Sequence, residues 1–192
     1  EKQKDIDAVL IATPDHTHAV ISMAAIQAGK HVFCQKPLCH DVYEARMLAK
    51  AASEAKVVTQ MGIQGHSGEG LRIICEWIWD GAIGEVREVD AWCSLSYYPW
   101  GHAKWSSEWG GGGRPADNVP LPDKLNWDLW LGPAPDRPYH PAYHPLAWRC
   151  WWDFGNGMMG DRGVHTLDPV VSALKLGAPT SVEATSCGLN QE

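Results

Sequence analysis

The stretch Asp7-Ala8-Val9-Leu10-Ile11-Ala12-Thr13-Pro14-Asp15 decides how the chain begins to fold. The run from Asp7 to Ala12 is short and mainly apolar, which is typical of a strand buried on both faces of a parallel sheet. It ends at Thr13-Pro14-Asp15, where proline prevents the strand from continuing and Thr or Asp can cap a helix. We therefore predict a buried strand followed directly by a helix.

The same alternation of strand and helix continues along the next 45 residues or so. Asp41 and Glu44 have the spacing of a capping box, which marks a helix start. Three strands joined by two helical crossovers indicate half of a doubly wound parallel sheet. The predicted elements are a helix with apolar residues over 20–28, a strand over 31–34, a helix over 41–56 and a strand over 57–61.

The composition describes an acidic protein of ordinary hydrophobic content. Its 192 residues carry a formal net charge of −7 and no run of Lys and Arg, which disfavours a general binder of nucleic-acid phosphates. No apolar segment is long enough to span a bilayer, so we expect no membrane contact. The six cysteines form no C-x-x-C pair, which favours a reducing, cytoplasmic compartment. Because the sequence starts without Met, an upstream targeting segment stays an open alternative.

The character of the sequence changes after Gly62. Helical spacing predicts a helix over 71–78, and alternation predicts strands over 88–94 and 180–186. Residues 97–153 show no sustained period and hold eight of the eleven tryptophans. Disorder would leave these rings exposed, so we expect an ordered segment that faces a substrate. Its tryptophans either stack on sugar rings or fill a core.

The nine residues from Gly157 to His165 carry the most informative polar pair. A helix is predicted over 158–176, interrupted at Pro169. A spacing of four puts Asp161 and His165 on one helix face, about 6 Å apart. The carboxylate could then orient the imidazole or raise its basicity, as a general base requires. A surface acid beside a half-buried histidine has the same spacing, so both interpretations stay open.

Two predicted strand ends carry polar turns. Ligands of open α/β sheets bind beyond the carboxyl ends of the strands. The first turn is Thr13-Pro14-Asp15-His16-Thr17-His18, and the second is Cys34-Gln35-Lys36-Pro37-Leu38. A lysine fixed between a strand and a proline can donate to a substrate hydroxyl, although a solvated surface charge has the same pattern.

Three motifs together resemble one family. Thr13-Pro14-Asp15-x-x-His18, then Ala28-Gly29-Lys30-His31-Val32-x-Cys34-Gln35-Lys36-Pro37-Leu38, then Asp161-x-Gly163-x-His165 resemble the Gfo/Idh/MocA family of NAD(P)-dependent oxidoreductases. The resemblance implies an α/β chain: the second half of a Rossmann-type parallel sheet over 1–62, then part of an α+β domain with an open, largely antiparallel sheet over 63–192. G-x-G-x-x-G is absent. We therefore expect the phosphate-binding strand and helix to precede Glu1, and the second domain to continue past Glu192.

The resemblance also implies residue roles. Lys36 matches the lysine of the family's Glu-Lys-Pro motif, while Asp161 and His165 match its second catalytic motif. Gln35 stands where glutamate is commoner, which keeps hydrogen-bonding capacity but removes a charge beside Lys36. The expected contacts to NAD or NADP are Thr13, Pro14, Asp15, His18, Gln35, Lys36 and Pro37.

The irregular segment supplies candidate substrate contacts, namely Tyr139, His140, Tyr143, His144, Trp148 and Arg149. Each of them is also compatible with a structural role. His140 and His144 have a metal-ligand spacing, but two prolines disfavour the helix that such a zinc site needs, so no metal is expected.

We expect hydride transfer between a nicotinamide cofactor and a secondary alcohol of a sugar, cyclitol or related polyol. His165 would take the hydroxyl proton, Asp161 would orient His165, and Lys36 would polarise the reacting oxygen. Two alternatives stay open: a redox-neutral glycosidase or lyase using the same site, and a non-catalytic module that senses carbohydrate or nucleotide. We expect a homo-oligomer with a small carbohydrate or polyol as its partner. The chain alone is expected to be inactive, because it lacks the phosphate-binding motif.

Overall fold

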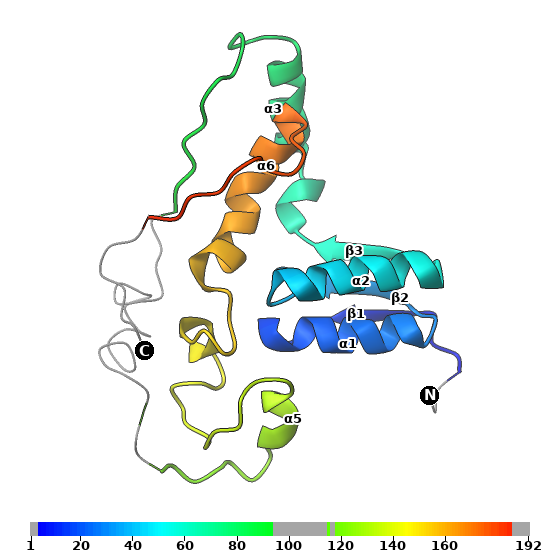
Figure 1. Cartoon of the computed structure of the whole chain (residues 1–192), viewed down its shortest axis with the longest axis vertical. Helices are drawn as coiled ribbons and strands as arrows, with labels where there is room; N and C mark the ends of the chain where they lie inside the picture. Colours follow the sequence, from blue (N-terminus) through cyan, green and yellow to red (C-terminus); the bar gives the residue numbers. More distant parts are fainter. Residues whose placement is uncertain (1–3, 94–114, 116–117, 186–192) are drawn as a thin grey trace.

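A three-stranded parallel sheet forms the first part of the computed structural model, which describes residues 4–93, 115 and 118–185. The strands lie in the order β1-β2-β3, and Cα pairing joins Ile11 to Cys34 and Cys34 to Met61. The carboxyl ends of all three strands therefore lie at one edge of the sheet (Figure 1). The elements are β1 (Ala8–Ile11), α1 (Asp15–Gln27), β2 (His31–Gln35), α2 (Val42–Ala55) and β3 (Thr59–Gly62).

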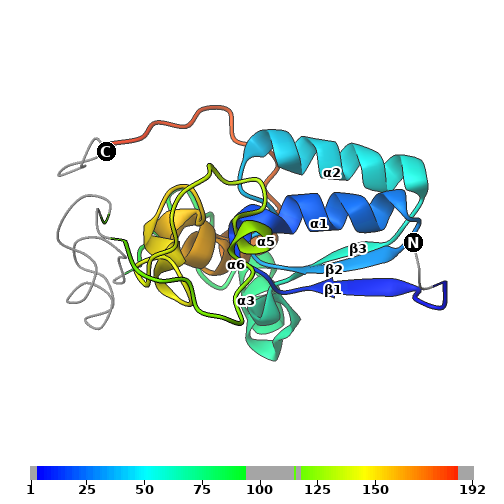
Figure 2. The ribbon, with the colours of Figure 1, turned by 90° about the horizontal axis from the view of Figure 1, so that it is seen from below.

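Both helices cover the same face of the sheet (Figure 2). On that face a small core of short aliphatic side chains forms around Ile11, Ile26 and Cys34. Burial of β1 on both faces was predicted, and this is wrong for the described residues: Leu10 and Phe33 are 69% and 37% exposed. No element of the described chain covers these two side chains, since α1 and α2 lie on the opposite face.

The first turn of α1 is buried although it is polar. Residues 15–19 are all buried, whereas Val20, which was predicted to belong to the buried stripe, is 50% exposed. The His16 N–H donates to the Phe154 carbonyl at 3.2 Å, so a distant segment packs over this turn. Tertiary contact, and not the apolar stripe, therefore decides which face of α1 is buried near its N-terminus.

The capping box at the start of α2 is confirmed. The Asp41 carboxylate accepts the Glu44 N–H at 2.8 Å, and the Glu44 carboxylate accepts the N–H groups of Asp41 and His40 at 3.3 and 2.7 Å. These bonds satisfy donors that the helix itself leaves unpaired. They also fix the chain that runs from the end of β2 into α2.

A pair of packed helices follows the sheet (Figure 1). η1 (Gln64–Ser67) leads into α3 (Glu69–Trp79), which packs against α6 (Val164–Leu174). Leu71, Cys75 and Ala173 form the buried centre of this contact, and the Trp79 indole donates to the Ala173 carbonyl at 2.7 Å. The predicted helix over 71–78 is thus confirmed, with Ile74 of its stripe 43% exposed.

The predicted helix over 158–176 is present, but its irregular point lies elsewhere. The π-helical turn η3 (Met159–Gly163) runs directly into α6, and Pro169 lies inside α6 without interrupting it. The predicted interruption at Pro169 is therefore wrong, because the helix tolerates the loss of one backbone donor there. The wider turn occurs instead at η3, which carries Asp161.

The strands predicted over 88–94 and 180–186 are not formed in their described parts, 88–93 and 180–185. An alternating sequence becomes a strand only beside a partner strand. The α/β class with a parallel sheet is confirmed, while the described residues contain no second sheet. In the same ranges, no helix combines the length and apolar character that crossing a bilayer requires.

Part of the irregular segment folds around aromatic rings. α5 (Trp127–Leu131) and η2 (Ala147–Cys150) enclose what we call the aromatic cluster, which consists of Trp127, Trp130, Tyr143, Trp148 and Phe154. Residues 118–153 of this segment are described, and several of their side chains pack together, while residues 97–114, 116 and 117 lie outside the described chain. These rings fill a core, whereas Trp152 is 77% exposed.

Candidate active site

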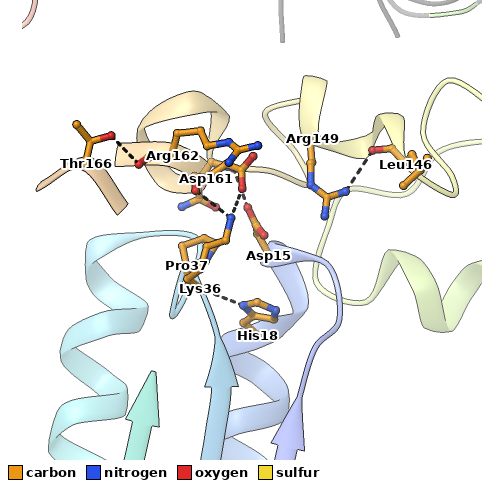
Figure 3. Close-up of polar contacts among 10 residues, drawn as sticks. Asp15, His18, Lys36, Pro37, Leu146, Arg149, Asp161, Arg162 and Thr166 are labelled. Atoms are coloured by element: carbon orange, nitrogen blue, oxygen red, sulfur yellow. Dashed lines mark hydrogen bonds and ion pairs between the residues drawn. The ribbon is translucent and has the colours of Figure 1, made fainter. Parts of the chain in front are cut away.

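An ion pair joins the carboxyl edge of the sheet to η3. Lys36 follows β2, and its ammonium pairs with the Asp161 carboxylate (Figure 3). The same ammonium donates to the Asp161 backbone carbonyl at 2.9 Å. The two side chains are 20% and 13% exposed, so the pair is largely shielded from solvent. The fold thus brings together two predicted catalytic residues that lie 125 positions apart in the sequence.

His165 lies in the first turn of α6, directly after η3. Partial burial lowers its pKa, and the positive charges of Lys36 and Arg162 lower it further, against the opposing charges of Asp161 and Asp168. A neutral imidazole near neutral pH is suited to accept a proton. The Asp161 carboxylate pairs with Lys36, and its charge raises the pKa of His165. That Asp161 orients His165 stays a prediction.

Asp15 is a buried acid beside this ion pair (Figure 3). Its residue is 6% exposed, and burial raises its pKa. The Asn156 N–H, which donates to the carboxylate at 3.2 Å, and the charges of His18 and Arg149 oppose that increase, while Asp161 adds to it. Asp15 was expected to contact the cofactor, but its observed contact joins α1 to the chain after the aromatic cluster.

His18 lies beneath the two polar turns and connects them. It is 1% exposed, with Nδ1 2.6 Å from the Pro37 carbonyl oxygen and Nε2 2.7 Å from the Thr13 carbonyl oxygen. Its expected role as a direct cofactor contact does not fit this burial. Pro37 is also buried.

The remaining expected cofactor contacts lie at the carboxyl edge with different accessibility. Thr13 is exposed and Pro14 is half-buried. Gln35 is half-buried and packs against Gly62, where an added Cβ would lie 2.8 Å from its Nε2. The Gln35 side chain therefore runs toward the end of β3, where glycine leaves room for it.

Asn156 belongs to the site, although the sequence did not single out its side chain. Its Nδ2 donates to the carbonyls of Cys39 and His40 at 3.2 and 3.0 Å, while its backbone N–H donates to Asp15. One residue thereby connects the chain after the aromatic cluster to both α1 and the turn before α2. Its signal in the sequence is the surrounding glycines: a Cβ added at Gly160 would lie 2.1 Å from the Asn156 Cβ.

Most of the expected substrate contacts are packing residues of the cluster region. Tyr143, His140 and Trp148 are only 3%, 6% and 5% exposed. Tyr139 packs edge-on against Trp127 at 5.4 Å between ring centroids, and His144 packs edge-on against Trp130 at 5.7 Å. The burial of three residues and the ring contacts of the half-buried Tyr139 and His144 favour a structural role for all five.

Arg149 is the expected substrate contact that reaches the site. Figure 3 shows its guanidinium directed toward Asp15 from the side opposite the Lys36–Asp161 pair. The group lies over the Trp148 ring at 4.1 Å and donates to the Leu146 carbonyl at 3.5 Å. Burial lowers the pKa of Arg149, and the Asp15 charge raises it. The aromatic cluster thus presents one cation to the site.

Two models of one protein family match the sequence. The first, described as the NAD-binding Rossmann fold of an oxidoreductase family, matches residues 1–63. The second, described as the C-terminal alpha/beta domain of that family, matches residues 99–187, and together they cover more than half of the chain. The chain belongs to the Gfo/Idh/MocA oxidoreductase family. The resemblance inferred from the three motifs is therefore confirmed.

Two curated relatives and one solved structure illustrate how much of this Gfo/Idh/MocA chain aligns. Levoglucosan dehydrogenase of Pseudarthrobacter phenanthrenivorans is 35% identical over 82 residues, which cover 43% of the chain and 21% of that protein. Inositol 2-dehydrogenase of Rhizobium meliloti is 37% identical over 89 residues, covering 46% and 27%. The chain thus spans about a quarter of the length of the curated relatives it matches. A solved inositol dehydrogenase homologue from Azotobacter vinelandii is 39% identical, covers 45% of this chain and 23% of its own, and has a TM-score of 0.42.

Proposed function

We propose that the protein carrying this chain transfers a hydride between NAD or NADP and a secondary alcohol of a sugar, cyclitol or related polyol. The observation that carries the proposal is the shielded Lys36–Asp161 pair with His165 beside it, at the carboxyl edge of a parallel sheet. The relatives named levoglucosan dehydrogenase and inositol 2-dehydrogenase support this substrate class. We set the boundary between a 1–62 cofactor domain and a 63–192 substrate domain at the end of β3.

The residues at the sheet edge fit the nicotinamide end of such a cofactor. Thr13 is exposed, and its hydroxyl, which accepts from Thr17 at 2.7 Å, keeps its own proton to donate. Together with the partly exposed Lys36 at the adjacent strand end, it forms a donor set that suits a polar ring. When bound, the cofactor supplies or accepts the hydride. Within the described ranges, no three His, Cys, Asp or Glu side chains are arranged to hold a metal ion.

Lys36, Asp161 and His165 would each have a separate role in alcohol oxidation. The Lys36 ammonium donates a hydrogen bond to the reacting oxygen, and Asp161 holds that ammonium in place. A ring nitrogen of His165 accepts the hydroxyl proton, for which its lowered pKa keeps the imidazole neutral. The carbinol C–H bond breaks as the C=O bond forms, and the hydrogen leaves with the electron pair as a hydride, for which oxidised nicotinamide would be the acceptor. The alcohol becomes a ketone and His165 keeps the proton.

The decisive test uses paired variants of the protein that carries this chain. His165→Ala should lower kcat/KM by about 10²–10⁴-fold, because the general base is lost. Lys36→Met should cause a comparable loss, whereas Lys50→Met, which changes a 68% exposed lysine of α2, should leave turnover unchanged. NAD(P)H absorbance with a panel of polyols provides the readout. Unchanged turnover in both site variants would overturn the proposal.

The same assay separates the two alternatives. Accumulation of reduced cofactor with a ketone product supports the dehydrogenase. Release of free sugar from a glycoside without net cofactor reduction would instead show the redox-neutral glycosidase or lyase. Binding of a polyol with neither reaction would show a sensing module.

A further inference from the structure

His18 has hydrogen-bond acceptors on both sides of its ring. Its Nδ1 lies 2.6 Å from the Pro37 carbonyl oxygen, and its Nε2 lies 2.7 Å from the Thr13 carbonyl oxygen. A carbonyl oxygen can only accept, while a neutral imidazole has a single N–H to donate. A neutral ring would therefore direct one lone pair at a carbonyl oxygen inside a site that is 1% exposed.

We propose that His18 is a positioning residue for Lys36, and that it acts as an imidazolium whose two N–H groups join the turn after β1 to the turn after β2. This role rests on the function proposed above for Lys36. Pro37 follows Lys36 directly, so a bond that fixes the Pro37 carbonyl also fixes the backbone from which the lysine extends. Charge-assisted bonds of this kind are shorter and stronger than neutral ones.

The surroundings of His18 suit a positive charge. Asp15 lies one helical turn earlier in α1 and is 6% exposed. The charge of His18 lowers the pKa of the Asp15 carboxyl, against the larger effect of burial. A buried cation requires such a partner. In Figure 3, Asp15 lies beside the Lys36–Asp161 pair and His18 lies below it.

His16 provides a natural contrast in the same helix turn. Its Nε2 lies 2.9 Å from the Trp130 carbonyl oxygen, and its Nδ1 has no hydrogen-bond partner among the described residues. Burial lowers the pKa of His16 against the effect of hydrogen bonds to the Trp130 and Phe154 backbone, and the charges of His40 and His18 lower it further. His16 thus needs one ring N–H to donate, whereas His18 needs two.

The first experiment reads the protons directly. In protein labelled with ¹⁵N-histidine, both ring nitrogens of His18 should carry a proton at neutral pH, and only one ring nitrogen of His16 should do so. His18→Gln and His16→Gln samples assign the two sets of signals. A single protonated nitrogen on His18 would overturn the proposal. This readout does not depend on turnover, so it decides the matter even if the proposed reaction is wrong.

The second experiment reads the position of Lys36. His18→Ala should expose Lys36, raising its rate of acetylation several-fold by mass spectrometry, and should lower kcat by about 10- to 100-fold with a smaller change in KM. His18→Gln serves the same purpose if the alanine variant does not fold. Ser22→Ala, a change at an equally buried polar residue of α1, should leave acetylation of Lys36 unchanged. Unchanged acetylation in the His18 variants would overturn the positioning role.

Chemical rescue distinguishes two-sided donation from simple filling of space. Imidazole added to His18→Ala should restore the slow acetylation of Lys36, because its cation donates from both nitrogens. 1-Methylimidazole fits a similar volume but has one nitrogen that cannot donate, so it should not restore the slow rate. Equal rescue by both compounds would show that His18 only fills a cavity, which would overturn the proposal.

Discussion

The sheet region, residues 4–62, and the aromatic cluster hold their side chains in place by different means. In the sheet region, regular strand pairing and two capped or packed helices fix the backbone around small aliphatic residues. In the cluster, the helices are only five and four residues long. There the indole of Trp127 and that of the neighbouring Trp151 donate to backbone carbonyls at 2.7 Å, and rings pack on one another. Backbone regularity positions one half of the site, and side-chain packing positions the other.

The two regions meet at the first turn of α1. His16 receives contacts from the cluster at its backbone and its ring nitrogen, and its ring packs on those of Trp130 and Phe154. Asn156 adds a bond to Asp15. The helix that begins at the carboxyl edge of the sheet is thus docked onto the cluster, so damage to the cluster should reach the catalytic residues through α1.

The largest effect should come from removing the central ring of the cluster. Phe154 is 0% exposed and packs on the rings of His16, Trp130 and Tyr143. Phe154→Ala should lower the free energy of unfolding by about 3–5 kcal/mol, because it removes buried surface and leaves a cavity. Urea denaturation measures the loss. A decrease below about 1 kcal/mol would mean that the cluster collapses around the gap, unlike a close-packed core.

A smaller effect is expected from the helix cap in the sheet region. Asp41→Ala should cost about 1 kcal/mol of unfolding free energy, because α2 loses the side chain that accepts the Glu44 N–H. Asp41→Asn, which keeps an acceptor at that position, should recover most of the loss. Urea denaturation measures both variants. Equal losses in Asp41→Ala and Asp41→Asn would contradict a stabilising role for the side-chain acceptor.

What the sequence could predict follows from how local each interaction is. The strand-helix alternation and the Asp41–Glu44 capping box depend on residues a few positions apart, and both are present. The burial of Asp15 and His16 depends on Asn156 and Trp130, which lie 141 and 114 positions away. A polar turn at a strand end looks the same in sequence whether it faces a ligand or a packed segment.

The same contrast between local and long-range interactions applies to the site. The motif resemblance predicted that Lys36, Asp161 and His165 belong together, and the structure brings Lys36 to Asp161. It did not predict the π-helical turn at η3, because an i,i+4 spacing assumes a regular helix. Nor did it reveal Asn156, whose amide bonds to carbonyls more than 100 positions away.

The pH dependence of kcat/KM tests the charges that surround His165. If His165 accepts a proton, kcat/KM should rise with pH as the imidazole loses its own proton, with a midpoint below the ordinary pKa of 6.5. Arg162→Gln removes a cation that lowers the His165 pKa, so the midpoint should move upward. Lys50→Met, far from the site on an exposed helix face, should leave the midpoint unchanged. A downward shift in Arg162→Gln would contradict the charge arrangement around His165.

The smallest stability effect is expected at the exposed edge of the cluster region. Trp152 is 77% exposed, and its ring lies 5.8 Å from that of His40, whose carbonyl accepts from Asn156. Trp152→Ala should change the unfolding free energy by no more than about 0.5 kcal/mol, since little buried surface is lost. If the ring stacks on a sugar face, KM should rise several-fold at unchanged kcat, and Trp152→Phe should keep most of the affinity. A large loss of stability with unchanged KM would instead assign Trp152 to the packed core with its neighbours.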